Sequence, residues 1–152
     1  MAEYLYNEVQ SVSLNQAAIF NASIPCNRGY VFHENGTGNF ILRGIVNNPC
    51  DNRARYHVIA RGNIAVPTGG TVGAIAMALS VNGEVRPTSR SIVTPAAVNE
   101  YGNFTCSATI DVPRGCCFNV ALRAVPASDD PTVTPVPVIS LQNASFEVSR
   151  TA

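Results

Sequence analysis

Hydrophobic and polar residues alternate along most of this chain with a period of two. The clearest example is residues 103–125, NFTCSATIDVPRGCCFNVALRAV. Such alternation is typical of a strand that buries one face, because successive side chains point to opposite sides of a sheet. Pro113-Arg114-Gly115 interrupts the pattern, so we expect two long strands joined by a tight hairpin turn. The two apolar faces would consist of Phe104, Cys106, Ala108, Ile110 and Val112, and of Cys116, Phe118, Val120, Leu122 and Ala124.

Turn residues divide the rest of the chain into similar segments. Asn35-Gly36 and Asn82-Gly83 supply the positive φ angles that tight hairpin turns require. The proline-rich segment 126–137 is expected to be an exposed loop, and no helix longer than a turn is predicted. The pattern therefore predicts an all-β protein, a jelly-roll β-sandwich of about eight to ten antiparallel strands. The other strands are expected at residues 17–25, 30–33, 39–44, 53–66, 71–81, 91–98 and 138–149.

The first 14 residues alternate only weakly and precede a domain at residues 15–152. They are either an edge strand of the sandwich or an arm that contacts another protein. In the second case Tyr4, Leu5 and Tyr6 would be the apolar anchors. The segment does not have the pattern of a signal peptide, and no stretch is apolar enough for a membrane span. We therefore expect synthesis in a cytoplasm and no membrane partner.

Charged residues make up only 13% of the chain, against about 25% in typical domains. A monomer of this composition would expose much neutral surface, which favours contact with other subunits. All ten basic residues are arginine, the cation best suited to interfaces because its planar guanidinium is weakly hydrated. The arginines form no cluster along the sequence, so nucleic-acid binding is not expected.

The five cysteines show no metal-binding spacing. Cys106 and Cys116 are expected to fill the core as small apolar side chains. Adjacent residues of a strand face opposite ways, so Cys117 would point away from Cys116. A bridge between Cys26 and Cys50 is conceivable because both lie beside turn residues.

No catalytic constellation is recognisable, and an enzyme is the least expected function. His33 and His57 have no evident partner of the kind that orients a catalytic histidine, so both are expected to be structural. Asp129 and Asp130 lie near Ser128 and Thr132 only, whereas calcium needs six to eight oxygen ligands. We expect a solvated loop there, no cofactor and no metal.

Three consecutive segments carry a resemblance to a known fold family. They are GNIAVPTGGTVGAIAMALSVNGEVRPTS, SIVTPAAVNEYGNFTCSATIDVPRGCCFNVALRAV and ISLQNASFEVSR. In this order they resemble the trimeric jelly-roll domains of the TNF/C1q type, most of all the short versions in structural genes of phages that infect gut Firmicutes. The resemblance spans roughly residues 15–150. It implies two sheets packed face to face and three subunits around a three-fold axis.

The resemblance also implies a function on a virion. We expect a homotrimeric decoration or stabilising protein on the outer surface of a phage capsid, with the major capsid protein as its partner. The alternative is a carbohydrate-binding or receptor-binding module, which would contact a host-surface glycan through loop 126–137 and the Asn35 hairpin. The absence of tryptophan weakens that alternative. Residues expected at the trimer interface are Tyr56, Val58, Cys117 and Phe118.

Overall fold

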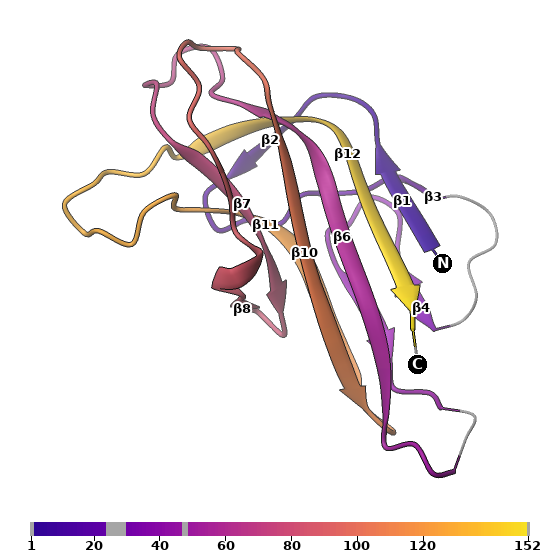
Figure 1. The fold of residues 1–152 in the computed structure, drawn as a ribbon. Helices are drawn as coiled ribbons and strands as arrows, with labels where there is room; N and C mark the ends of the chain where they lie inside the picture. The colour runs from indigo at the N-terminus through magenta and orange to yellow at the C-terminus, as the bar shows by residue number, and fades with distance from the viewer. Residues whose placement is uncertain (1, 24–29, 47–48, 152) are drawn as a thin grey trace.

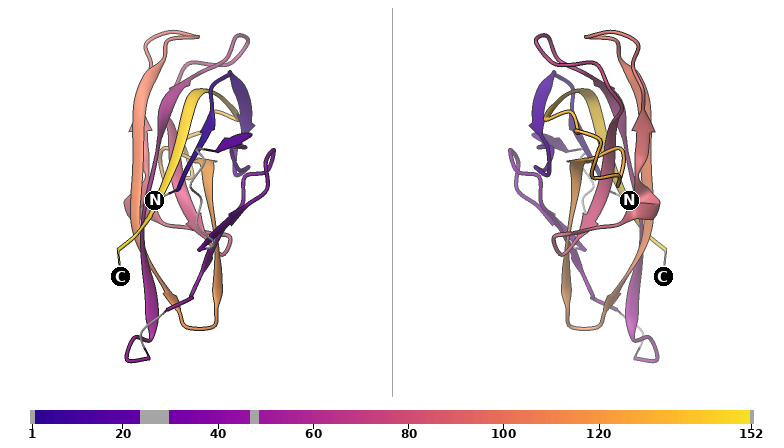
Figure 2. Two further views of the ribbon diagram at one scale, coloured as in Figure 1. Left: turned by 90° about the vertical axis from the view of Figure 1, so that its right-hand side faces the viewer. Right: turned by 90° about the vertical axis from the view of Figure 1, so that its left-hand side faces the viewer.

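The computed structural model describes residues 2–23, 30–46 and 49–151, and these residues form two antiparallel sheets packed face to face (Figures 1 and 2). Sheet A contains β1 (Ala2–Tyr6), β2 (Gln10–Ser13), β3 (Ala22–Ser23), β6 (Arg53–Ala65), β10 (Gly102–Pro113) and β12 (Val138–Arg150). Sheet B contains β4 (Val31–His33), β5 (Phe40–Arg43), β7 (Ile75–Val81), β8 (Glu84–Val85), β9 (Ser91–Val93) and β11 (Cys117–Val125). A single 3₁₀ turn, η1, covers Pro87–Ser89.

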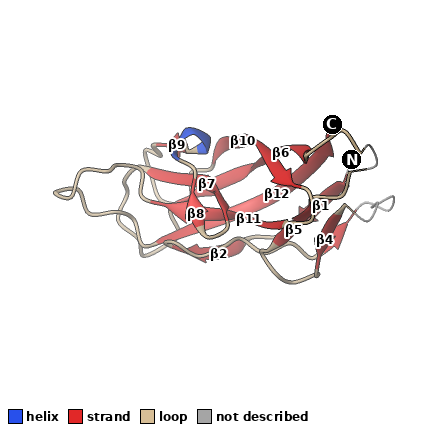
Figure 3. Ribbon diagram, turned by 90° about the horizontal axis from the view of Figure 1, so that it is seen from below, coloured by secondary structure: helices blue, strands red, loops and turns tan. Residues whose placement is uncertain are grey.

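The strand order identifies a jelly roll. Sheet A runs β10-β6-β12-β1-β3, with β2 beside β12, and sheet B runs β4-β5-β11-β7-β8, with β9 beside β7. Strands distant in sequence become neighbours, and the view from below shows that nearly all of the regular structure is strand (Figure 3). No described segment forms a helix long and apolar enough to cross a membrane. The all-β jelly-roll sandwich expected from the sequence is confirmed.

The core lies between the sheets and is built by the alternation that the sequence displays. Residues 54–60 of β6 are buried at every second position, and β10 shows nearly the same alternation, as expected for strands with one face against a second sheet, whereas β12 buries residues 139–141 and 144–146 in two short runs. Aromatic rings fill the centre, where Phe40 stacks on Phe146 at 3.9 Å between ring centroids. Tyr4 and Phe20 pack edge-on against Phe40, so the N-terminal segment contributes to the same core.

The hairpin expected at residues 103–125 is wrong. Its two strands do form, but β10 pairs with β6 in sheet A, whereas β11 pairs with β5 and β7 in sheet B. Pro113 to Cys116 carry the chain from one sheet to the other at the lower end of Figure 1. The two apolar faces therefore meet across the core instead of lying side by side. Alternation tells which face of a strand is buried but not which strand is its neighbour.

The two Asn-Gly hairpins are confirmed. Asn82 and Gly83 have φ angles of 53° and 84°, and they connect β7 to β8. Gly36 has φ 86° in the loop between β4 and β5, which pair with each other. The strand expected at 91–98 ends at Val93, because Pro95 cannot donate to a ladder. The region expected as strand 17–25 contributes only isolated bridges and β3 among its described residues.

Candidate interaction surface on sheet A

The outer face of sheet A is not covered by any other part of the described chain. The edge-on views show β10 and β6 at the surface of the molecule (Figure 2). Residues of four strands form cross-strand rows on this face, set by the register of β10, β6, β12 and β1. From one end to the other the rows are Thr105–Arg61–Ser145–Leu5, Ser107–Ile59–Glu147–Glu3, Thr109–His57–Ser149 and Asp111–Arg55–Thr151.

Six of the fourteen residues in these rows carry a small hydroxyl side chain. Thr105, Ser107 and Thr109 of β10 are exposed, and half-buried Ile59 of β6 lies beside Ser107. Hydroxyl groups donate and accept hydrogen bonds and are easily desolvated compared with charged groups. The hydroxyl-bearing part of this face can therefore pack against another protein surface at a lower desolvation cost than its charged part.

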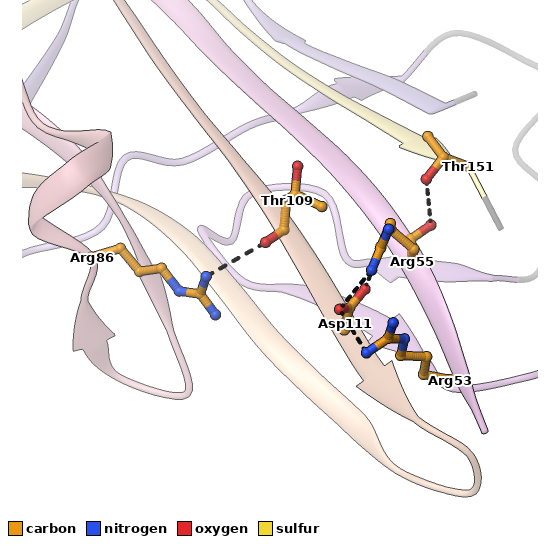
Figure 4. A network of polar contacts seen from close by, with 6 residues as sticks. All are labelled: Arg53, Arg55, Arg86, Thr109, Asp111 and Thr151. Atoms are coloured by element: carbon orange, nitrogen blue, oxygen red, sulfur yellow. Dashed lines mark hydrogen bonds and ion pairs between the residues drawn. The ribbon is translucent and has the colours of Figure 1, made fainter.

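A polar network occupies the lower end of the face (Figure 4). The Arg55 guanidinium donates from Nε to Asp111 Oδ1 at 2.8 Å and from Nη2 to Oδ2 at 3.2 Å. Arg53 Nη1 lies 3.5 Å from the same carboxylate. The hydrogen bond from Arg55 holds the pKa of Asp111 below its usual value, and it raises the pKa of Arg55. Both groups therefore stay charged over the physiological range.

A second ion pair lies in the middle of the face. Arg61 Nη2 donates to Glu147 Oε1 at 2.7 Å, across the β6–β12 pair. Glu3 lies directly opposite Glu147 on β1, and Ser145 Oγ donates to Glu3 Oε1 at 3.3 Å. This face thus carries charges of both signs, with the carboxylates of Glu3 and Glu147 side by side on neighbouring strands.

The outer face of sheet B is different because the chain itself covers part of it. Ala76 and Ala78 of β7 point outward and are nevertheless fully buried, in a small cluster with Val125 that Val85 and Ala127 pack against. Arg123 spans the same face and donates to Ser80 Oγ and to the Asn15 carbonyl. Sheet A therefore offers the larger uncovered surface.

Comparison with solved structures identifies the fold. The globular domain of a zebrafish complement 1qA protein superposes with a TM-score of 0.58 at 13% identity, covering 99% of this chain and 97% of that one. The Eiger TNF of S. frugiperda superposes with a TM-score of 0.65 at 10% identity, covering 100% and 92%. The fold is the jelly roll of the C1q and TNF domains. No protein-family model matches the chain, and no curated protein matches it by sequence.

Two of the residues expected at the trimer interface of this jelly roll lie inside the subunit. Tyr56 and Val58 of β6 are fully buried between the sheets, so they are core residues and cannot contact a neighbouring chain in this fold. The alternation marks the Tyr56 face of β6 as the apolar one, but it does not tell whether a second sheet or a second subunit covers that face. Residues Arg55, His57 and Ile59 of the same strand occupy the outer face instead.

Cys117 and Phe118 begin β11 in the other sheet, and they face opposite ways. Cys117 is exposed on the outer face of sheet B, while half-buried Phe118 packs against the core. The four expected interface residues therefore do not share one surface. Cys106 is buried, as expected, and burial raises the pKa of its thiol to about 12. Cys116 is exposed in the turn before β11, so its assignment to the core is wrong.

The expected anchor residues belong to a strand and do not form a projecting arm. β1 pairs with β12 along its whole length, and β3 flanks it for two residues. Tyr4 is buried in the core, and Tyr6 packs against the core from the same side. Leu5 alone points to the outer face of sheet A, where it lies half-buried opposite Ser145.

The other candidate groups serve local structure. The ring nitrogens of His33 lie 3.0 Å from the Asn39 carbonyl oxygen and 3.1 Å from that of Phe20. Asp129 pairs with Arg90 at 3.1 Å, while Asp130 accepts hydrogen bonds from the backbone and hydroxyl of Thr132, which lower its pKa. The described residues contain no group of three potential metal ligands. Of the two cysteines considered for a bridge, Cys26 lies outside the described residues, and Cys50 is exposed.

Proposed function

We propose that the chain is a virion structural protein that decorates and stabilises a phage capsid. It would bind the outer capsid surface as a homotrimer after synthesis in the host cytoplasm. Its partners would be two further copies of itself and the major capsid protein. The likeness to C1q and TNF domains over the whole chain supports a trimeric jelly roll. The resemblance of residues 15–150 to the short phage versions supports the place on a capsid.

The observation that carries the trimer is the uncovered outer face of sheet A. Four strands present hydroxyl groups, half-buried Ile59 and Leu5, and two ion pairs there, with no covering layer from the described chain. Closed rotational symmetry lets each copy bury this face against its neighbours. Ion pairs already formed within one subunit lose less on desolvation than isolated charges would.

Two arginine substitutions test which face forms the contact. Ser107→Arg places a long cation on the edge strand β10 of the outer face of sheet A, whereas Cys117→Arg places one on the outer face of sheet B. Both positions are exposed, so both variants should fold. We expect Ser107→Arg to dissociate the trimer and Cys117→Arg to leave it intact. If Cys117→Arg dissociates the trimer and Ser107→Arg does not, the contact lies on sheet B, at the cysteine that the sequence analysis placed at the interface.

Capsid binding needs its own measurement. Shells of the phage that carries the gene are prepared without this protein. Purified protein is then mixed with them, and its co-sedimentation with the shells is measured. Saturable binding at a fixed number of sites, together with a higher melting temperature of the shells, would support decoration. A protein that ignores the shells but is retained on a glycan array would contradict it.

One observation favours the alternative of glycan binding. A hollow of about 320 Å³ lies over the irregularity of β12 on sheet A and is lined by amide and hydroxyl groups. Such groups suit a hydroxyl-rich sugar, although the aromatic floor, Phe104, is buried. Retention on the array that is lost in Asn103→Ala would assign this hollow as the site. Its lining consists of Arg61, Gly62, Asn63, Asn103, Phe104, Thr105, Asn143 and Ser145.

A further inference from the structure

Half of the arginines of this chain gather at one end of the sandwich. They come from the end of β5, the start of β6, the turn after β10 and the end of β12, which the strand register brings together. Only two of the ten acidic residues, Asp51 and Asp111, lie among them. We call this surface the basic end. Its arginines are Arg43, Arg53, Arg55, Arg114 and Arg150.

The backbone segments that carry these arginines meet at this end of the sandwich. Arg53 lies opposite Pro113 at the end of the β6–β10 ladder, and the Arg114 backbone donates to the Asn52 carbonyl at 2.8 Å. Arg43 lies opposite Cys117, next to the same turn. Arg150 stacks on Tyr30, with 4.3 Å between its guanidinium carbon and the ring centroid. Five arginines against two aspartates leave three positive charges in excess.

The rest of the molecule has the opposite sign. Eight acidic residues lie outside the basic end, with four arginines among the described residues there. The net charge of zero therefore conceals a separation of charge along the molecule. A charge separation of this kind orients a protein toward a partner of opposite sign before contact is made.

The surface of the basic end is also hollowed. One depression of about 500 Å³ is lined by residues 50–53 and Arg55, and a second of about 370 Å³ is lined by residues 43–46 and 114–117. The side chain of Arg53 is 60% exposed and that of Arg55 is 42% exposed. Partner groups can therefore reach the Arg53 guanidinium, whereas the Arg55 guanidinium already holds Asp111 on the outer face of sheet A.

A guanidinium binds carboxylates and phosphates with the same geometry, but the acidic residues at this end disfavour a continuous run of phosphates. Arg55 and Asp111 already show the two-pronged geometry in which a guanidinium holds a carboxylate. Asp51 and Asp111 are interspersed with the arginines and would repel the continuous phosphates of a nucleic acid. The whole chain has a pI near 6.7, well below that of typical nucleic-acid-binding domains.

We infer that the basic end is the surface through which the assembled protein docks onto an acidic protein surface, with carboxylates of the partner as its ligands. In an assembly with a single rotation axis, equivalent points of all subunits lie at the same height along that axis. A trimer would therefore present three basic ends to one partner surface at once. This inference rests on the proposed function insofar as that partner is the capsid shell.

Charge reversal tests the basic end. Arg53→Glu and Arg114→Glu each remove two units of charge there, and either variant can stand for the other if one fails to fold. The matched control, Val72→Glu with Val133→Glu, adds two negative charges at exposed sites outside the basic end. Binding is measured to capsid shells and to immobilised poly-L-glutamate, at ionic strengths of about 0.05 M and about 0.5 M.

We expect each reversal to weaken shell binding by about tenfold or more, because three contacts change at once in a trimer. The control should bind as the original chain does, and higher salt should weaken binding of both. Soluble poly-L-glutamate should compete, while duplex DNA and phosphatidylserine vesicles should not. The inference would be overturned if Arg53→Glu and Arg114→Glu both bind shells as the original chain does. It would also be overturned if DNA or the vesicles compete as well as poly-L-glutamate.

The two proposals fail in different ways. If the original chain does not bind shells, the capsid role fails, and retention on poly-L-glutamate then decides the question of the basic end. Retention that is lost in Arg53→Glu and Arg114→Glu but kept in the control would uphold it. No retention of the original chain, or equal retention of all variants, would reject it.

Discussion

Tyr56 shows how a single side chain connects the two sheets. It belongs to β6 of sheet A, yet its hydroxyl donates to the Arg43 carbonyl at the end of β5 in sheet B. The Tyr30 carbonyl oxygen lies 3.3 Å from the same hydroxyl. Burial raises the pKa of Tyr56, so the group remains a neutral donor. A residue selected from the sequence as an interface candidate is thus a structural link inside one subunit.

Tyr56→Phe should therefore destabilise the subunit without changing its assembly. Loss of the hydroxyl leaves the Arg43 carbonyl without this donor, which costs about 1–2 kcal/mol in the free energy of unfolding. Denaturant titration measures the change, and Tyr101→Phe, at an exposed tyrosine, should have no effect. Unchanged stability of Tyr56→Phe together with a dissociated oligomer would place Tyr56 at an interface after all.

Asp111 gives the protein a component of stability that depends on pH. Because the hydrogen bond from Arg55 lowers its pKa in the folded state, the stabilisation is present above the unfolded pKa of about 3.9. It is lost as the pH falls through the lower folded pKa.

Asp111→Asn should accordingly melt below the original chain at pH 7, and the difference should shrink toward about pH 2.5. Thermal melting at the two pH values measures it. Asp51→Asn removes the same charge from an exposed position outside the ion pair and serves as the control. A difference that is constant with pH would mean that the carboxylate does not act through its charge.

At the scale of elements, the sequence determines faces and turns better than partners. β6 is recognisable because its alternation is long and regular. In β12 only Ala144, Phe146 and Val148 carry this signal, beyond the irregularity of the strand. Asn82-Gly83 is recognisable because tight turns with positive φ angles favour these residues. The partners of β10 and β11 were not, because a tight turn can join two strands of one sheet or cross between sheets. β7 is buried on both faces. In the sequence, only its small residues, such as Ala76 and Ala78, indicate that its outer face is covered by another part of the chain.

The β7–β8 hairpin provides a test of turn chemistry. Gly83 has φ 84°, and an added Cβ would meet no atom within 4 Å, so Gly83→Ala introduces backbone strain without a clash. We expect a loss of about 1–2 kcal/mol in unfolding free energy. In the control, Gly73→Ala, the nearest atom would lie at an ordinary 3.4 Å from Cβ and φ is not positive. Equal effects of the two substitutions would show that the turn does not constrain this hairpin.

At the scale of the whole molecule, the two candidate surfaces could not be derived from the sequence. The outer face of sheet A joins four strands from both ends of the chain, and the basic end joins arginines from four separate segments. Neither forms a local motif, and both depend on the register of strands distant in sequence. The uncovered face and the separated charges together suggest an assembly that packs through sheet A and docks through one end.

The molar mass of the purified chain in solution, measured by light scattering during gel filtration, tests this assembly. We predict three times the 16.1 kDa of one chain, and a lower mass for Ser107→Arg whose melting temperature is otherwise retained. A mass of 16.1 kDa at every concentration, or a trimer that Ser107→Arg leaves intact, would contradict packing through the outer face of sheet A.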